Sequence, residues 1–282
     1  MRARGVGLTG QLRGTAPSRP LGGGGSPPSA LDQRQALQED LRGRRPAFFL
    51  DYDGTLTAIV ERPEDAVLSE AMRRVLRQLS RRFPVAVVSG RDRRDVARRV
   101  GLPELWYAGS HGYDIAGPGG EITFQPAEPV VPRMAGLAVR LAREVGGIAG
   151  AQVEPKRFTV AVHYRRAAPA DVPRVEEVVN RTVSDHPELR KTSGKKVWEI
   201  RPALDWDKGR AVLWLLDALD LDHPGVAPVY VGDDETDEDA FRALRDRGIG
   251  ILVTDVPRPT AARYRLAGPQ EVGEWLAAMA DG

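Results

Sequence analysis

The 282-residue sequence contains no cysteine, which excludes a disulfide framework, a thiolate zinc site and a cysteine nucleophile. The absence also fits a reducing compartment, so we expect a cytoplasmic protein. Long apolar runs are missing as well: none approaches the roughly 18–20 residues that span a bilayer, and none forms the apolar core of a signal peptide. We therefore expect no membrane partner.

Acidic residues are absent from residues 1–30, which carry four arginines. The whole chain has 41 basic and 39 acidic residues and a pI of about 9.0. Removing the four arginines leaves 37 basic against 39 acidic residues, a net charge of −2 for the rest of the chain. The basic pI therefore belongs to the N-terminal segment, and the rest of the chain gives no support for a nucleic-acid partner. Residues 21–28 read LGGGGSPP, which is typical of a flexible linker, and we predict a disordered tail over residues 1–40.

Short apolar runs alternate with amphipathic helical patterns from Ala47 onward. The apolar runs cover residues 47–50, 85–88, 229–231 and 249–253. Fully apolar strands that alternate with such helices indicate an α/β fold with a doubly wound, Rossmann-like parallel sheet. Ligands bind such sheets beyond the carboxyl ends of the strands, and three of these runs end in polar clusters.

The middle of the chain has a different pattern. Residues 121–124, 158–165 and 196–201 alternate apolar and polar side chains, with helical stretches between them. Alternation is typical of a sheet with one buried and one exposed face. We therefore predict an inserted α+β cap over residues 113–202, within a core built from residues 41–112 and 203–282.

Acidic side chains follow two of the predicted core strands. Asp51 and Asp53 follow the first strand, and Asp233, Asp234 and Asp237 follow a later one. Carboxylates gathered at one sheet edge repel one another unless a cation compensates. Hard divalent cations prefer oxygen ligands, and Mg²⁺ fits best because it leaves positions for water and substrate phosphate.

Three further polar residues complete a candidate phosphoryl site. Ser89 and Arg91 lie at a strand-to-helix junction, where anions bind readily, and Lys208 opens a helix. Each residue considered alone is more often a helix cap or a solvated side chain. Together with the carboxylates and a cation they describe a site that holds phosphoryl oxygens and places a carboxylate in line with phosphorus.

The order and spacing of these motifs resemble those of haloacid-dehalogenase-type phosphatases over about 200 residues. Finer motifs resemble the trehalose-6-phosphate phosphatase family. They are GSHG at 109–112, EPKR at 154–157, HYR at 163–165, GKKVWEIRP at 194–202, DKG at 207–209 and GDDETDEDAF at 232–241. The first motif carries Tyr52 where this family usually has phenylalanine, which leaves the catalytic residues unaffected.

The resemblance implies a role for each motif residue. Asp51 is the nucleophile that forms an aspartyl-phosphate, and Asp53 is the general acid and base. Ser89 and Lys208 hold phosphoryl oxygens. The cofactor Mg²⁺ is held by the Asp51 carboxylate, the Asp53 main-chain carbonyl and the Asp233 carboxylate. Asp237 is expected outside the ligand set, where it orients waters or Lys208. For Asp234 both roles, metal ligand and such an outer position, stay open.

Sugar recognition is expected mainly from the cap, because selecting a neutral disaccharide requires well-placed hydrogen-bonding groups. Lys195 and Glu199 are the first candidates to bind the distal glucose. Weaker candidates, for which a solvated or satisfied polar residue is about as common, are His111, Lys156, Arg157, His163 and Arg165, and the expected substrate contacts also include Arg91 and Gly112. The junctions near Gly112 and Pro202 are expected to act as hinges that let the cap close.

The resulting hypothesis is a Mg²⁺-dependent phosphatase that hydrolyses trehalose 6-phosphate to trehalose and phosphate, the last step of trehalose biosynthesis. Its partner is a small sugar phosphate, with no nucleic acid or membrane involved, and a monomer is favoured. The alternatives are a phosphatase for another sugar phosphate such as sucrose phosphate, a phosphomutase, or a non-catalytic sugar-phosphate sensor. The sensor is disfavoured because it need not keep both Asp51 and Asp53.

Overall fold

The computed structural model describes residues 26–120, 123–194 and 196–281 and contains two sheets. The core sheet has eight strands in the order β12-β11-β10-β1-β2-β3-β4-β5, and the six strands from β12 to β3 are parallel. This confirms the predicted α/β class. The strands are β1 (Arg45–Leu50), β2 (Val85–Val88), β3 (Trp106–Gly109), β4 (Asp114–Ala116), β5 (Thr123–Phe124), β10 (Val226–Gly232), β11 (Ile249–Val253) and β12 (Tyr264–Leu266).

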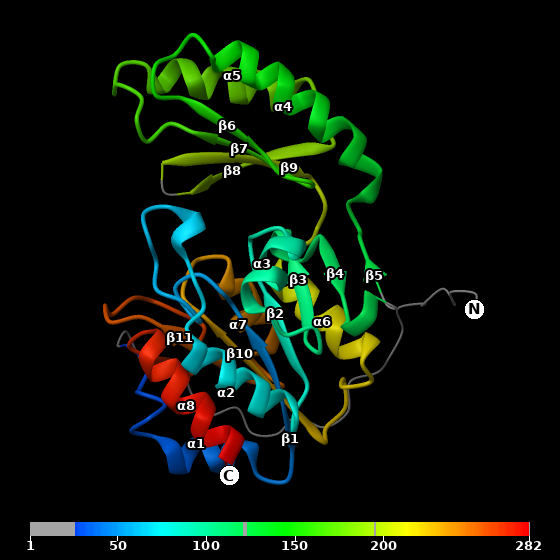
Figure 1. The fold of residues 1–282 in the computed structure, drawn as a ribbon, viewed down its shortest axis with the longest axis vertical. Helices are drawn as coiled ribbons and strands as arrows, with labels where there is room; N and C mark the ends of the chain where they lie inside the picture. The colour runs from blue at the N-terminus through cyan, green and yellow to red at the C-terminus, as the bar shows by residue number, and fades with distance from the viewer. Residues whose placement is uncertain (1–25, 121–122, 195, 282) are drawn as a thin grey trace, which may run out of the picture.

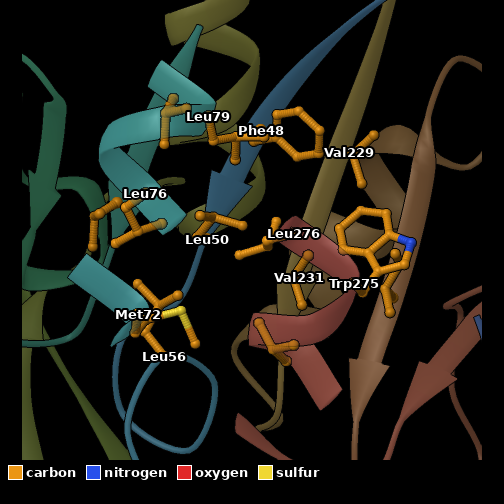
Figure 2. Packing of buried hydrophobic residues seen from close by; sticks show 14 of the residues in the cluster. Phe48, Leu50, Leu56, Met72, Leu76, Leu79, Val229, Val231, Trp275 and Leu276 are labelled. Atoms are coloured by element: carbon orange, nitrogen blue, oxygen red, sulfur yellow. The ribbon is translucent and has the colours of Figure 1, made fainter. Parts of the chain in front are cut away.

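Helices cover both faces of the core sheet, as Figure 1 shows. The helices of the core are α1 (Arg34–Leu41), α2 (Glu70–Ser80), α3 (Arg93–Val100), α6 (Lys208–Ala218), α7 (Asp237–Leu244) and α8 (Pro269–Asp281). Phe48 and Leu50 of β1 pack with α1, α2, α3 and α8, whereas Ala47 and Phe49 pack with α6 and α7. Neighbouring strand residues point to opposite faces, so a strand buried on both sides must be apolar throughout. Figure 2 shows Leu50 between Leu76 of α2 and Leu276 of α8, and Phe48 between Leu79 of α2 and Val229 of β10.

The second sheet is antiparallel, with the order β6-β7-β9-β8. Its strands are β6 (Gln152–Pro155), β7 (Val160–His163), β8 (Leu189–Gly194) and β9 (Val197–Pro202), and its helices are α4 (Val131–Val145) and α5 (Val172–Ser184). Both helices cover its outer face (Figure 1), where Val160, Val162, Trp198 and Ile200 join them in a separate hydrophobic core. The alternate residues of β7 and β9 therefore face the core domain.

Short 3₁₀ turns connect these elements: η1 (Pro63–Asp65), η2 (Ser110–Gly112), η3 (Pro118–Gly120) and η4 (Glu128–Val130). A side-chain cap marks the start of two helices, α2 and α6. The Ser69 side chain accepts a hydrogen bond from the Met72 amide, and the Asp207 side chain accepts one from the Arg210 amide. The second cap fixes the start of α6 at Lys208.

Two predicted boundaries differ from the structure. The segment predicted as a tail contains helix α1, whose Leu37 is buried, and Ser29 forms a parallel bridge with Arg265 beside β12. These contacts order the chain before residue 41, while residues 1–25 lie outside the described residues. Helix α1 has only two leucines, Leu37 and Leu41, in a mostly polar segment. Its apolar periodicity is therefore too weak to predict a helix from the sequence.

The second difference concerns the start of the cap at residue 113. Strands β4 and β5 pair antiparallel with the edge of the core sheet, although the segment 121–124 was expected in the cap. Phe124 stacks on Trp214 of α6, with 4.6 Å between ring centroids, which holds β5 on the core. The cap fold proper begins at α4, the first helix of its hydrophobic core.

Candidate active site

The site lies at the carboxyl edge of the parallel strands. Leu50 of β1 is aligned with Val231 of β10 and with Val87 of β2. This register places Asp51, Ser89 and the loop that begins at Asp233 next to one another. Lys208 enters the same edge as the first residue of α6.

Asp51 is buried and paired with Lys208. The Lys208 Nζ atom lies 2.8 Å from Asp51 Oδ1 and 2.7 Å from Asp237 Oδ1, and its side chain is 2% exposed. Burial disfavours the charged lysine, but the charges of Asp237 and Asp51 outweigh it and raise the pKa of Lys208 well above its ordinary value. The lysine is therefore a permanent cation beside the nucleophile candidate.

Asp237, the first residue of α7, is fully buried and accepts four hydrogen bonds. Its Oδ1 accepts from Lys208 Nζ and from the Tyr230 hydroxyl at 2.6 Å. Its Oδ2 accepts from the main-chain amides of Asp233 and Asp234, both at 2.9 Å. These bonds occupy both oxygens, so Asp237 organises the acidic loop and orients Lys208. Asp237 lies close enough to Asp51 and Asp233 to be grouped with them as a metal ligand. Because both of its carboxylate oxygens already accept hydrogen bonds, we interpret Asp237 as a residue that orients the metal ligands and does not bind the metal itself.

The remaining carboxylates of that group, Asp51 and Asp233, have the chemistry of a divalent-cation site. Burial raises the pKa of Asp51 well above its ordinary value, against the opposing effect of Lys208. Burial and the charges of Asp237 and Asp234 raise the pKa of Asp233 to about 7. A hard cation would relieve both costs, and carboxylate oxygens are ligands that Mg²⁺ prefers. The donor set therefore fits Mg²⁺.

The loop that begins at Asp233 lies so close to residue 54 that only a glycine fits there. Its φ angle is +85°, and a Cβ atom on it would lie 2.2 Å from an Asp233 carboxylate oxygen. The adjacent Thr55 donates a hydrogen bond from its hydroxyl to Asp233 Oδ1 at 3.3 Å. The Asp-x-Asp-Gly-Thr segment thus packs directly on the second acidic cluster.

Asp234 differs from Asp233 in its pKa. Although burial would raise it, the pKa of Asp234 lies below its ordinary value because Lys208 and nearby hydrogen-bond donors outweigh burial.

Asp53 and Arg91 form a bidentate ion pair. Arg91 Nε lies 2.7 Å from Asp53 Oδ2, and Arg91 Nη2 lies 2.6 Å from Asp53 Oδ1. The sequence analysis predicted that Arg91 contacts the substrate. In the structure its side chain pairs with Asp53, the expected general acid. Ser89 is buried, and its hydroxyl accepts a hydrogen bond from the Arg91 amide at 3.2 Å.

Glu199 of the cap reaches the core site. On the core-facing side of β9, its Oε1 lies 3.3 Å from Lys156 Nζ and 3.3 Å from the Thr159 hydroxyl. Its Oε2 lies 3.7 Å from Nε2 of His111, which belongs to η2 of the core. Although burial disfavours its charge, the Lys156 ammonium group lowers the pKa of Glu199, so the carboxylate stays ionised.

The other predicted recognition residues occupy different places. His163 Nε2 lies 2.8 Å from Glu154 on the neighbouring strand. Arg157 lies at the junction of cap and core, where it pairs with Glu128 and approaches Asp114. The carbonyl of Gly112 accepts a hydrogen bond from the Trp206 indole at 2.9 Å. Arg165 follows β7 and Lys195 lies outside the described residues.

Three residues of this region were not singled out by the sequence. Tyr230 lies inside an apolar strand, yet its hydroxyl binds Asp237. Thr55 binds Asp233, and its place directly after Gly54 was the signal that could have found it. Arg258 donates from Nη2 to the Asp233 carbonyl at 2.8 Å and to the Asp234 carbonyl at 3.3 Å. Nothing in the surrounding loop sequence marks that arginine.

Comparison with known proteins decides the family. Residues 49–270 match the family model described as trehalose-phosphatase. The chain belongs to the trehalose-phosphatase family. It is 43% identical over 270 residues to trehalose 6-phosphate phosphatase RA3 of Zea mays, a match that covers 90% of this chain and 75% of the relative. It is accordingly a phosphoric monoester hydrolase.

Solved structures support the same fold. The C-terminal domain of C. albicans trehalose-6-phosphate phosphatase superposes with a TM-score of 0.75 at 25% identity, covering 90% of this chain and 99% of that one. A haloacid dehalogenase-like hydrolase from Bacteroides thetaiotaomicron superposes with a TM-score of 0.60 at 15% identity, covering 84% and 99%. The chain thus shares its overall fold with both of these proteins. Within the described residues, no helix combines the length and apolarity needed to cross a membrane.

Proposed function

We propose that the chain hydrolyses trehalose 6-phosphate to trehalose and inorganic phosphate, the last step of trehalose biosynthesis. The observation that carries this proposal is the buried ion pair of Asp51 with Lys208 in the core, together with the contact of Glu199 of the cap with His111 of the core. Membership of the trehalose-phosphatase family supports the choice of substrate. A cytoplasmic monomer that acts on this small molecule alone remains part of the proposal.

In the first half-reaction Asp51 attacks phosphorus. A bond forms between its carboxylate oxygen and phosphorus, the bond between phosphorus and the sugar oxygen breaks, and Asp53 gives a proton to that oxygen. Lys208 offsets the charge that would otherwise keep a carboxylate away from a phosphate dianion. Mg²⁺, held by Asp51, Asp233 and the Asp53 carbonyl, would supply further charge neutralisation.

In the second half-reaction the aspartyl-phosphate is hydrolysed. Asp53 takes a proton from a water molecule, whose oxygen attacks phosphorus, and the bond from phosphorus to Asp51 breaks. This returns Asp51 as a carboxylate and Asp53 as an acid. Two easier displacements thus replace one difficult one.

The cap supplies sugar selectivity in this proposal. Glu199 and Lys156 present a charged acceptor and donor toward the core site, which suits sugar hydroxyls. An unmatched buried polar group is costly, so these residues disfavour substrates without the second sugar. Lys195 remains a candidate for the same role.

The test is a phosphate-release assay over trehalose 6-phosphate, sucrose 6-phosphate and glucose 6-phosphate, with Mg²⁺ or with EDTA. We expect release from trehalose 6-phosphate at the highest kcat/KM, loss with EDTA, and recovery when Mg²⁺ is restored. Asp51→Asn is the matched control: it should remain folded by circular dichroism and lose at least about 10³-fold in kcat. Preference for sucrose 6-phosphate, insensitivity to EDTA or an active Asp51→Asn variant would each contradict a part of the proposal.

A further inference from the structure

The side chain of Asp53 is oriented by Arg91. The two residues share two parallel charge-assisted hydrogen bonds, a geometry that fixes direction as well as distance. The Asp53 side chain is 41% exposed, whereas that of Arg91 is 12% exposed. The arginine is therefore the fixed partner, and the more exposed carboxylate takes its orientation from it.

Arg91 is itself held from several sides. Its Nη2 also donates to the Pro63 carbonyl at 2.8 Å, and its Nη1 lies 3.3 Å from Asp95 Oδ2. The guanidinium carbon lies 5.4 Å from the centroid of the Tyr52 ring. These bonds occupy four of the five N–H groups of a guanidinium. Few donors remain for a substrate phosphate, so the contacts favour a role through Asp53.

We propose that Arg91 is a positioning residue, which holds Asp53 in the orientation from which it protonates the departing sugar oxygen and later accepts a proton from water. This inference rests on the proposed function. A carboxylate offers about four lone-pair directions, and Arg91 uses two of them. The other directions stay open for the proton that Asp53 transfers.

The role predicts a dependence on the leaving group. A sugar alkoxide leaves poorly without a proton, whereas p-nitrophenolate leaves without one. Misplacing a catalytic group by about 1 Å can cost about 10²-fold. The ratio kcat/KM covers only the steps up to irreversible release of the alcohol, so it excludes the second half-reaction, in which Asp53 acts on the same intermediate for both esters. Arg91→Met should therefore lower kcat/KM for trehalose 6-phosphate by roughly 10–100-fold, but lower kcat/KM for p-nitrophenyl phosphate by less than about threefold.

A matched control separates positioning from general loosening of the loop. Arg99 binds the same Asp95 at 2.8 Å and donates to the Glu64 and Ala66 carbonyls, but it does not contact Asp53. Arg99→Met should leave the ratio of the two activities unchanged. Arg91→Lys keeps the charge without the paired N–H groups, so it should behave like Arg91→Met, and full recovery by lysine would overturn the role.

The Asp53→Asn variant distinguishes failure of this inference from failure of the proposed function. If Asp53→Asn lowers kcat/KM equally for both esters, the acid role itself is wrong. If Asp53→Asn lowers kcat/KM selectively for the sugar ester but Arg91→Met lowers kcat/KM equally for both esters, as loss of a phosphate contact would, the inference is wrong and the proposed function stands. In the Asp53→Asn background we expect Arg91→Met to cause no further selective loss.

Discussion

His111 combines an unusual backbone with an enclosed ring. Its φ angle is +56°, in the left-handed region, and its ring lies so close to Gly90 that a Cβ atom there would approach it to 2.8 Å. Burial lowers the pKa of His111 to about 4, although Glu199 opposes this shift. The imidazole is therefore neutral near pH 7.

This shift has a sign that can be tested through stability. The ordinary histidine pKa is near 6.5, so the unfolded chain binds more protons at this position between pH 6.5 and 4, and the free energy of unfolding falls as the pH drops through that window. His111→Asn does not titrate there, and asparagine tolerates positive φ. Urea unfolding at pH 7, 5.5 and 4.5 should show a smaller decline for the variant. Parallel declines would refute the prediction.

At this scale the sequence predicted residues with a clear chemical signal. Asp51 and Asp233 follow apolar strands, and the parallel register explains why they meet. Tyr230 was missed because its aromatic body fits an apolar strand and only the fold shows its hydroxyl beside Asp237. The Arg91–Asp53 pair was missed because their sequence separation gives no information about side-chain direction.

The loop from β11 to β12, residues 254–263, forms hydrogen bonds to the acidic loop that begins at Asp233 and to α7. Arg258 donates to the carbonyls of Asp233 and Asp234, and Glu238 of α7 accepts from the Ala261 amide at 2.8 Å. These bonds join two loops at the carboxyl edge. The carbonyl contacts restrict where the Asp233 side chain can point.

Arg258→Met should therefore weaken Mg²⁺ binding. Outer contacts of metal ligands typically change metal affinity by about 10–100-fold, and we expect the lower end because the contact is to the main chain. Titration calorimetry with Mg²⁺ measures the effect without turnover. Arg263→Met is the control, because Arg263 is in the same loop but pairs with Asp40, 2.9 Å away. Equal affinities for both variants would exclude this role for Arg258.

Among the elements, those with a strong apolar pattern were predicted well. β2 and β11 coincide with expected apolar runs, and β1 and β10 contain the other two. β4 and β5 were not assigned to the core, because a strand of two or three residues has too few positions to show which sheet it joins. Their place depends on tertiary contacts such as Phe124 on Trp214.

Across the whole molecule, Glu199 connects the two domains. Glu199→Ala should lower kcat/KM for trehalose 6-phosphate by at least about tenfold, because a site built to hydrogen-bond a hydroxyl loses its charged partner. A small ester such as p-nitrophenyl phosphate should be little affected. Glu188→Ala is the matched control, since Glu188 pairs with Arg133 within the cap. Equal losses on both substrates would contradict a recognition role for Glu199.

The inserted arrangement of the cap was predictable because the periodicity changes from fully apolar strands to alternating ones. The side chains that join the domains were not predictable. The Tyr113 hydroxyl donates to the Pro202 carbonyl at 3.3 Å, so the two connecting segments meet, and Phe158 stacks on Tyr113. Arg157 was expected at the sugar but lies in this junction, because a motif gives the residue type and not the domain face it contacts.

The two edge strands of the core sheet affect whether separate molecules can associate edge to edge. An open edge strand presents unpaired amides and carbonyls to which another chain can add a strand. Here the strand at one edge, β5, has two residues, and the strand at the other, β12, has three. The main chain of Pro28–Ala30 also covers β12 through hydrogen bonds to Arg265. The ordered segment before α1 therefore protects the sheet against edge-to-edge aggregation, and cutting it away would expose that edge.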